Sequence, residues 1–234
     1  MSDASLPPTS ARLINLAGHE LRTPASVVIG YLRMLLAEHP GPLTDRQRMM
    51  LSEAQHSSQR MNAIIAEMSE LSNLEAGTLA LARQRIVVAP LLRQAIGAVG
   101  PLESPIGDGQ PAGPVEAHMA DEGAAITGDP ARLCTAIASI VRAMARERRD
   151  ATPLIVDGGL QTNQAQRMVL IRIGAEASVP LLGGPRGEFD RWRGGLGLSL
   201  PIAQLVIEAA GGQIWSPPGD VNHAATGMAF PVTE

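Results

Sequence analysis

The sequence predicts a helical hairpin followed by a domain of mixed helices and strands. Apolar side chains recur at helical spacing over residues 10–79, whereas the remainder alternates short β-type runs with Gly- and Pro-rich segments. We expect two domains, 1–82 and 83–234. With 234 residues and a hydrophobic fraction of 45%, the chain is long enough and apolar enough to form two packed cores.

The first helix is expected over residues 10–39, because apolar residues return every seven positions on one face. This track consists of Ile14, Leu21, Val28 and Leu35. Two prolines and a glycine in residues 39–42 end the helix, since they cannot continue its hydrogen bonds. Thr44 then offers an N-cap for a second helix that runs to about residue 79.

Both helices carry apolar stripes that are too wide for one partner helix to cover. Pairing two hairpins into a four-helix bundle would bury them, so we expect a homodimer. The same periodicity also fits an ordinary hairpin inside a larger monomer.

From residue 85 onward the pattern indicates an α+β domain. Seven prolines and glycines make residues 101–114 a loop, and a turn is expected around residues 161–164. The expected helices span 90–99, 131–146 and 198–209, and the expected strands span 115–119, 124–127, 153–157, 168–173, 213–215 and 227–231.

Composition excludes several classes of partner. A formal net charge of -4 gives no general attraction to nucleic acid, and two Trp, one Tyr and two Phe offer little surface for base stacking. The chain lacks an export signal and the run of about 20 apolar residues that crosses a membrane. The single Cys134 excludes an internal disulfide. We therefore expect a cytoplasmic protein with no nucleic-acid or membrane partner.

Residues 19–24, His-Glu-Leu-Arg-Thr-Pro, lie midway along the first predicted helix. A neutral imidazole has one nitrogen free to attack phosphorus, and an adjacent carboxylate can accept the other N–H and orient the ring. These properties make His19 a candidate nucleophile and Glu20 its orienting base. Pro24 lacks a backbone donor and is expected to bend the helix beside His19.

This hexapeptide resembles the phosphoacceptor box of sensor histidine kinases. The resemblance implies that His19 carries the phosphoryl group and that Thr23 positions water to hydrolyse a partner's phospho-aspartate. Similarity continues, patchily, through the second domain. The matching segments are 74–77, the exit from the second helix; Asp129, Arg132 and Leu133; the aromatic box 189–192; the second glycine box 195–198; and the strand entry 210–215.

The resemblance implies an α plus α/β sandwich architecture. In this architecture the hairpin forms a dimeric four-helix bundle and precedes a histidine-kinase/Hsp90-like ATPase-type α/β domain. That second domain departs from the family's pattern. Ser139 and Ala143 stand where the family has the asparagine that coordinates magnesium, and no adenine-reading aspartate is present unless Glu176 replaces it. Two residues replace the lid over the triphosphate, Arg193 and Gly194.

We therefore expect a degenerate domain that has lost ATP binding and autophosphorylation and has no cofactor or metal of its own. Gly195 and Gly197 would be vestigial and would serve tight helix–sheet packing, and Asp129 would serve as a helix N-cap. His39, His56, His118 and His223 have no metal-ligand spacing and are expected on the surface.

An intact phosphoacceptor beside a degraded ATP site predicts a histidine phosphotransfer protein of a phosphorelay. His19 would take the phosphoryl group from a receiver domain on an upstream hybrid histidine kinase and pass it to a response regulator, with Mg²⁺ supplied by the receiver. The expected docking surface next to His19 comprises Ser26, Val27, Ile29, Gly30, Arg33, Met61, Ile65 and Met68. Two alternatives remain open: a histidine kinase that still uses ATP, and a non-catalytic pseudokinase adaptor.

Overall fold

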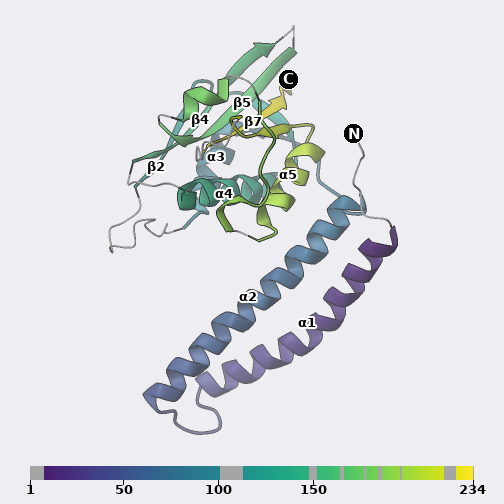
Figure 1. The fold of residues 1–234 in the computed structure, drawn as a ribbon, viewed down its shortest axis with the longest axis vertical. Helices are drawn as coiled ribbons and strands as arrows, with labels where there is room; N and C mark the ends of the chain where they lie inside the picture. Colours follow the sequence, from purple (N-terminus) through teal and green to yellow (C-terminus); the bar gives the residue numbers. More distant parts are fainter. Residues whose placement is uncertain are drawn as a thin grey trace. The chain divides into compact units, whose positions relative to one another are not determined.

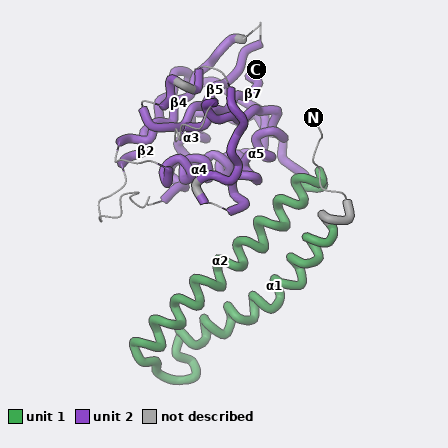
Figure 2. Tube along the Cα trace, in the orientation of Figure 1, with its two compact units in different colours: residues 1–79 green, residues 80–234 purple. Residues whose placement is uncertain are grey.

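The computed structural model describes residues 8–100, 113–147, 152–163, 166–176, 178–183, 186–195, 197–218 and 225–233. The chain divides into two compact units, residues 1–79 and 80–234, which Figure 2 colours separately. Unit 1 is a helical hairpin, and unit 2 is an α/β domain (Figure 1).

Unit 1 consists of two long antiparallel helices, α1 (Pro8–Leu36) and α2 (Asp45–Glu75), as Figure 1 shows. Both predicted helices are confirmed, although each ends several residues earlier than expected. The seam between them is narrow, and its main aliphatic members are Ala25, Ile29 and Leu32 from α1 and Ile65 from α2.

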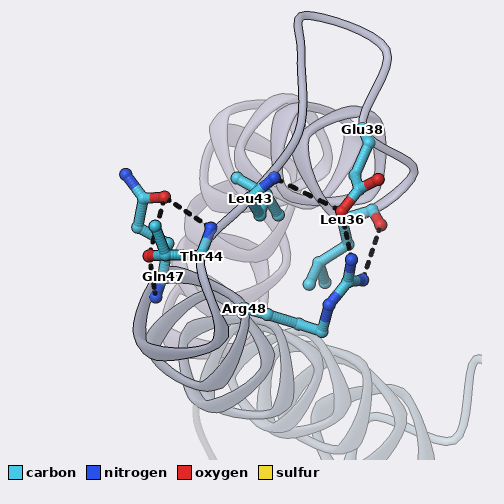
Figure 3. A network of polar contacts seen from close by, with 6 residues as sticks. All are labelled: Leu36, Glu38, Leu43, Thr44, Gln47 and Arg48. Atoms are coloured by element: carbon cyan, nitrogen blue, oxygen red, sulfur yellow. Dashed lines mark hydrogen bonds and ion pairs between the residues drawn. The ribbon is translucent and has the colours of Figure 1, made fainter.

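The turn between the helices is held by polar contacts, drawn in Figure 3. The Thr44 hydroxyl accepts the Gln47 N–H at 3.3 Å, and the Gln47 side-chain oxygen accepts the Thr44 N–H at 2.9 Å. These two bonds form a capping box, so Thr44 is the N-cap that the sequence predicts. Arg48 forms an ion pair with Glu38, whose carboxylate also accepts the Leu43 N–H at 3.3 Å.

Unit 2 is built on a five-stranded sheet of order β2-β4-β5-β7-β6, with a separate antiparallel pair, β1 and β3. Within the larger sheet, β2 and β4 are parallel and the other neighbours are antiparallel. The strands are β1 (Gln84–Val87), β2 (Val115–Met119), β3 (Ala125–Gly128), β4 (Leu154–Asn163), β5 (Gln166–Ala175), β6 (Gln213–Trp215) and β7 (Ala225–Pro231). The helices are α3 (Val88–Gly97), α4 (Pro130–Glu147) and α5 (Ser199–Ala209), with short 3₁₀ turns η1 (Val179–Gly183) and η2 (Arg193–Gly195).

The three helices pack on one face of the larger sheet (Figure 1). Helix α4 lies at the centre of this core and is buried around most of its circumference, as expected of a helix that is apolar on several sides. The Thr226 hydroxyl of β7 contacts the Met144 sulfur of α4 at 3.4 Å. The side chains of Ile171 and Phe230 complete the core and are fully buried.

On the opposite face of the sheet, Trp215 packs flat against Gly227. A Cβ at Gly227 would lie 2.4 Å from the indole, so glycine is required there. The Arg186 guanidinium covers the other side of the ring at 4.0 Å from its centroid. Leu182, Ala225 and Ala229 surround Trp215 and form a second, smaller apolar cluster.

The observed elements correct some of the predicted boundaries in unit 2. Strands β4 and β5 are longer than expected, so Gln161 belongs to a strand and not to the predicted turn. The sequence did not predict β1 as a separate strand. Most of the predicted loop 101–114 lies outside the described residues.

Asp129 caps the N-terminus of α4, as predicted. Its carboxylate accepts the Arg132 N–H at 3.1 Å and the Ala82 N–H at 3.2 Å, and the Arg132 guanidinium lies 3.9 Å away. Partial burial raises the pKa of the Asp129 carboxyl, but the N–H groups of Arg132, Ala82 and Ala131 and the Arg132 charge lower it by more. The net pKa is therefore below the ordinary value.

Loss of the capping box should destabilise the hairpin. Thr44→Ala removes the side-chain oxygen that accepts the Gln47 N–H, and we expect the free energy of unfolding to fall by about 1 kcal/mol. Circular dichroism of the full chain in increasing urea measures this loss. Thr44→Ser retains the hydroxyl and should stay close to wild type; equal losses in both variants would contradict a capping role.

The Asp129 cap should make stability depend on pH. Because the folded pKa lies below the unfolded value of about 3.9, the carboxylate stabilises the folded state above about pH 4, and this stabilisation disappears as pH falls through the folded pKa. Asp129→Asn should be less stable than wild type at pH 7, and the difference should shrink below pH 4. Urea unfolding followed by tryptophan fluorescence tests this, and a difference that ignores pH would exclude the charge as the cause.

Candidate functional site

His19 lies midway along α1 with its side chain exposed to solvent. Glu20 and Thr23 are also exposed, whereas Gly18, directly before His19, is buried against α2. An exposed imidazole on a rigid helix can meet a reactive group on a second protein without any rearrangement of its own backbone.

Helix α1 runs unbroken through Pro24. Since proline has no N–H, the carbonyl of Glu20 loses the hydrogen bond that residue 24 would normally donate. A polar backbone group is thereby freed one residue after His19. The expected bend of the helix at this point stays a prediction.

The contact between the helices includes both polar and aliphatic groups. Near His19, the Asn15 amide of α1 donates to the Asn73 side chain of α2 at 2.8 Å, and Ile65 of α2 lies beside Gly18. The Ser69 hydroxyl donates to the Ile65 carbonyl within α2 at 3.1 Å, and Ser72 is buried in the same half of the hairpin. Nearer the turn, Ala25, Ile29 and Leu32 of α1 and Ser58 of α2 are buried.

The predicted docking surface needs one correction. Ile29 and Ile65 are only 7% and 8% exposed, because they face each other's helix in the seam and hold the hairpin together. They cannot present side chains to a partner. The remaining members are accessible: Ser26, Val27, Gly30, Arg33 and Met61 are exposed, and Met68 is half-buried.

Large apolar side chains also cover the outside of the hairpin. Leu21 and Val28, on the seven-residue track seen in the sequence, are 50% and 45% exposed, so this track does not face α2. An apolar surface of this extent is typical of an interaction site. Its members are Leu13, Leu16, Leu21, Val27, Val28, Tyr31 and Met34 on α1 and Met49, Met50, Met61 and Ile64 on α2.

In unit 2, the positions that correspond to magnesium-binding asparagine lie in the packed core. Ser139 is 5% exposed and Ala143 is fully buried. Ala143 has no ligand atom, and Ser139 is almost entirely inaccessible to solvent. These residues do not fit a Mg-ATP site. Glu176, the candidate adenine-reading carboxylate, is exposed just after β5.

Arg193 holds the short lid segment against the domain. Its guanidinium donates to the Glu147 Oε1 at 3.0 Å, to the Ser216 hydroxyl at 3.2 Å and to the Ala225 carbonyl at 3.3 Å, and its Nη2 forms an ion pair with the Glu147 Oε2 at 2.8 Å. The Arg193 and Glu147 side chains are 9% and 12% exposed. Arg193 thus binds groups of the protein itself. The sequence did not predict these contacts.

Gly195 and Gly197 have a backbone role. Gly195 and Gly197 have φ of +61° and +62°, a conformation that side chains disfavour. A Cβ at Gly195 would meet nothing within 4 Å. At Gly195 the prediction of tight helix–sheet packing is therefore wrong: this glycine serves the turn.

The described residues outside the His19 motif form no cluster of metal-ligating side chains. Over the described ranges, no group of three or more His, Cys, Asp or Glu side chains could hold a metal ion. Cys134 is buried, and burial raises the pKa of its thiol. His39, His56 and His118 are exposed, while His223 lies outside the described residues. None of the helices in the described part of the chain is both long and apolar enough to cross a membrane.

Comparisons with known proteins extend these observations. Residues 10–77 match the model of the His Kinase A (phospho-acceptor) domain. The sensor protein GacS of Pseudomonas syringae pv. syringae is 26% identical over 86% of this chain, and the sensor protein DivL of Caulobacter vibrioides is 29% identical over 84%. The chain spans about a quarter of the length of these relatives, 23% and 25%.

A solved structure shares the fold across both units. The structure is that of full-length ShkA, crystallised in complex with AMPPNP. The match covers 95% of this chain and 46% of the ShkA chain, with a TM-score of 0.69 and 16% sequence identity. The helical hairpin followed by an α/β domain is thus also the fold of ShkA. Residues 10–77 thus match a His Kinase A (phospho-acceptor) domain, and most of the chain is similar to sensor proteins such as GacS and DivL.

Proposed function

We propose that this protein is a histidine phosphotransferase that carries phosphoryl groups between receiver domains on His19. The observation that carries the proposal is the contrast between its two units. His19 is exposed within a matched phospho-acceptor domain, whereas Ser139 and Ala143 are buried where a kinase needs a magnesium ligand. The acceptor is retained and the machinery for ATP is not.

The chemistry consists of two related transfers. A ring nitrogen of neutral His19 attacks the phosphorus of a receiver's aspartyl phosphate; the N–P bond forms as the P–O bond breaks, and aspartate leaves as a carboxylate. The proton on the other ring nitrogen remains there, and the charge that develops on the ring is stabilised by Glu20. The second transfer reverses these bond changes toward the aspartate of a response regulator.

Two neighbouring residues have supporting roles in this proposal. Glu20 orients the imidazole and stabilises its charge, and Thr23 positions water when a phospho-regulator is hydrolysed in place of donating to His19. Both side chains are exposed on the same stretch of α1 and can reach a docked receiver. Magnesium enters with the receiver's acidic pocket, because the described part of this chain offers no cluster for it.

The receiver would dock on the exposed face beside His19. Ser26, Val27, Gly30 and Arg33 continue this face along α1, and Met61 adds to it from α2. A receiver on an upstream hybrid kinase and a downstream response regulator would use the same surface in turn. We place this exchange in the cytoplasm, because a chain with a single cysteine suits a reducing compartment.

The Arg193 contacts support the loss of ATP use. A lid that closes on a triphosphate needs mobile residues and free positive charge, whereas Arg193 is buried and paired with Glu147. Freeing it would leave the Glu147 carboxylate without its cation in a buried place, which is strongly unfavourable. A true histidine kinase is the second candidate, since the relatives GacS and DivL are named as sensor proteins.

Homodimerisation belongs to the proposal as well. The apolar track of Leu21 and Val28 points away from α2, and a second hairpin would bury it in a four-helix bundle. Leaving this surface in water would oppose a stable monomer, because each large aliphatic side chain gains about 1.5–3 kcal/mol on full burial.

Phosphoryl labelling tests the transfer. The purified full chain is incubated with magnesium and either radiolabelled ATP or a receiver domain labelled on its aspartate. We expect acid-labile label on the protein with the receiver alone. His19→Gln should abolish it, whereas His56→Gln, which changes another exposed histidine, should not. Label that appears with ATP alone would show that the protein is a kinase. If the signalling output in the cell persists in the His19→Gln variant, the non-catalytic adaptor is favoured.

The oligomeric state tests the apolar track. Val28→Glu places a charge on the surface that the second hairpin would cover, so sedimentation velocity should show a shift from dimer to monomer at micromolar concentration. Gln59→Glu adds the same charge at an exposed polar position of α2 and should leave the dimer intact. A monomeric wild type would remove the bundle from the proposal.

A further inference from the structure

Gly18 brings the two helices unusually close at the residue before His19. A Cβ at Gly18 would lie 2.7 Å from the Ser69 Oγ, which is shorter than real Cβ contacts. The next atoms, Cγ2 and the carbonyl oxygen of Ile65, are at 3.8 and 3.9 Å and would make ordinary contacts. A side chain at position 18 would therefore require the Ser69 hydroxyl oxygen, or helix α1 itself, to move.

That oxygen is held in place. The Ser69 hydroxyl donates to the Ile65 carbonyl one turn earlier on α2, at 3.1 Å. Turning the hydroxyl away would break this hydrogen bond. The Gly18–Ser69 contact therefore sets a minimum separation between α1 and α2 at the level of the phosphoacceptor.

A glycine within a helix is unfavourable by itself relative to alanine. Gly30, on the same helix, faces open space and makes no close approach. Gly18 differs because its missing side chain is used for contact. The Asn15 amide donates to the Asn73 side chain in the same part of the seam, and the buried Ile65 lies beside Gly18.

We propose that Gly18 is a positioning residue for His19: together with Ser69, it seats α1 against α2 at the separation that places the imidazole for in-line attack on a docked phosphoryl donor. This inference rests on the proposed phosphotransfer function. A methyl group at position 18 pushes α1 away by several tenths of an ångström and carries His19 with it, while the imidazole stays exposed and chemically intact. Misplacement by about 1 Å can slow a reaction about 100-fold, so a smaller shift should slow transfer about tenfold.

Three variants of the full chain test the geometry: Gly18→Ala, Ser69→Ala and the double variant. Single-turnover transfer is measured over a range of labelled receiver concentrations, with the thermal unfolding midpoint recorded in parallel. We expect Gly18→Ala to lower the maximal rate about tenfold, with little change in the half-saturating concentration. Ser69→Ala should stay close to wild type. The double variant should recover, because removing Oγ leaves the nearest neighbours at 3.8 Å.

The outcomes separate this inference from the function on which it rests. A Gly18→Ala protein as fast as wild type, or a double variant as slow as Gly18→Ala, overturns the positioning role. The positioning role is also overturned if the transfer rate of Gly18→Ala falls together with its unfolding midpoint and the double variant does not recover the rate. If the receiver fails to label wild-type His19 but ATP succeeds, the phosphotransfer function fails, and the same comparison with ATP as donor decides the role of Gly18. If neither donor labels His19, both proposals fail.

Discussion

The contact between α1 and α2 is narrow. This narrowness determines which side chains of unit 1 stay exposed to solvent. Two helices of 29 and 31 residues share a seam whose principal aliphatic members are Ala25, Ile29, Leu32 and Ile65. A seam of this width leaves other apolar side chains in water, including Leu21 and Val28. It also leaves His19 uncovered. The accessibility of the phosphoacceptor and the need for a second hairpin therefore have the same physical origin.

Unit 2 differs, because most side chains of its central helix are buried. Helix α4 is packed between the sheet and its neighbouring helices, and Ser139 and Ala143 are sealed within that packing. The ion pair between Arg193 and Glu147 ties the segment that contains Arg193 to the end of α4. An ATP-binding domain must keep such surfaces open and accept the instability that openness brings. Under the proposed function, these closed surfaces suit a domain that does not bind ATP.

The sequence predicts the order of helices and strands well, because Pro and Gly mark the ends of these elements locally. The motif around His19 is also a local pattern. Contacts between segments that are distant in the chain could not be predicted from the sequence. Nothing in residues 15–22 indicates that Gly18 meets Ser69, or that Ile29 and Ile65 turn inward, because the rotation of each helix about its axis depends on the other helix. The contacts of Arg193 join segments far apart in the chain, and β1 is a strand through its pairing with β3.

The stacking of Trp215 between Gly227 and Arg186 gives the molecule an optical asymmetry. Both tryptophans belong to unit 2, Trp215 being buried and Trp192 two-thirds exposed, while unit 1 contains Tyr31 as its aromatic residue. Intrinsic emission excited at the red edge of the indole band thus monitors the α/β unit alone, and the hairpin is silent in it. Far-ultraviolet dichroism, in contrast, is dominated by the two long helices. The two units can be watched separately in one unlabelled sample.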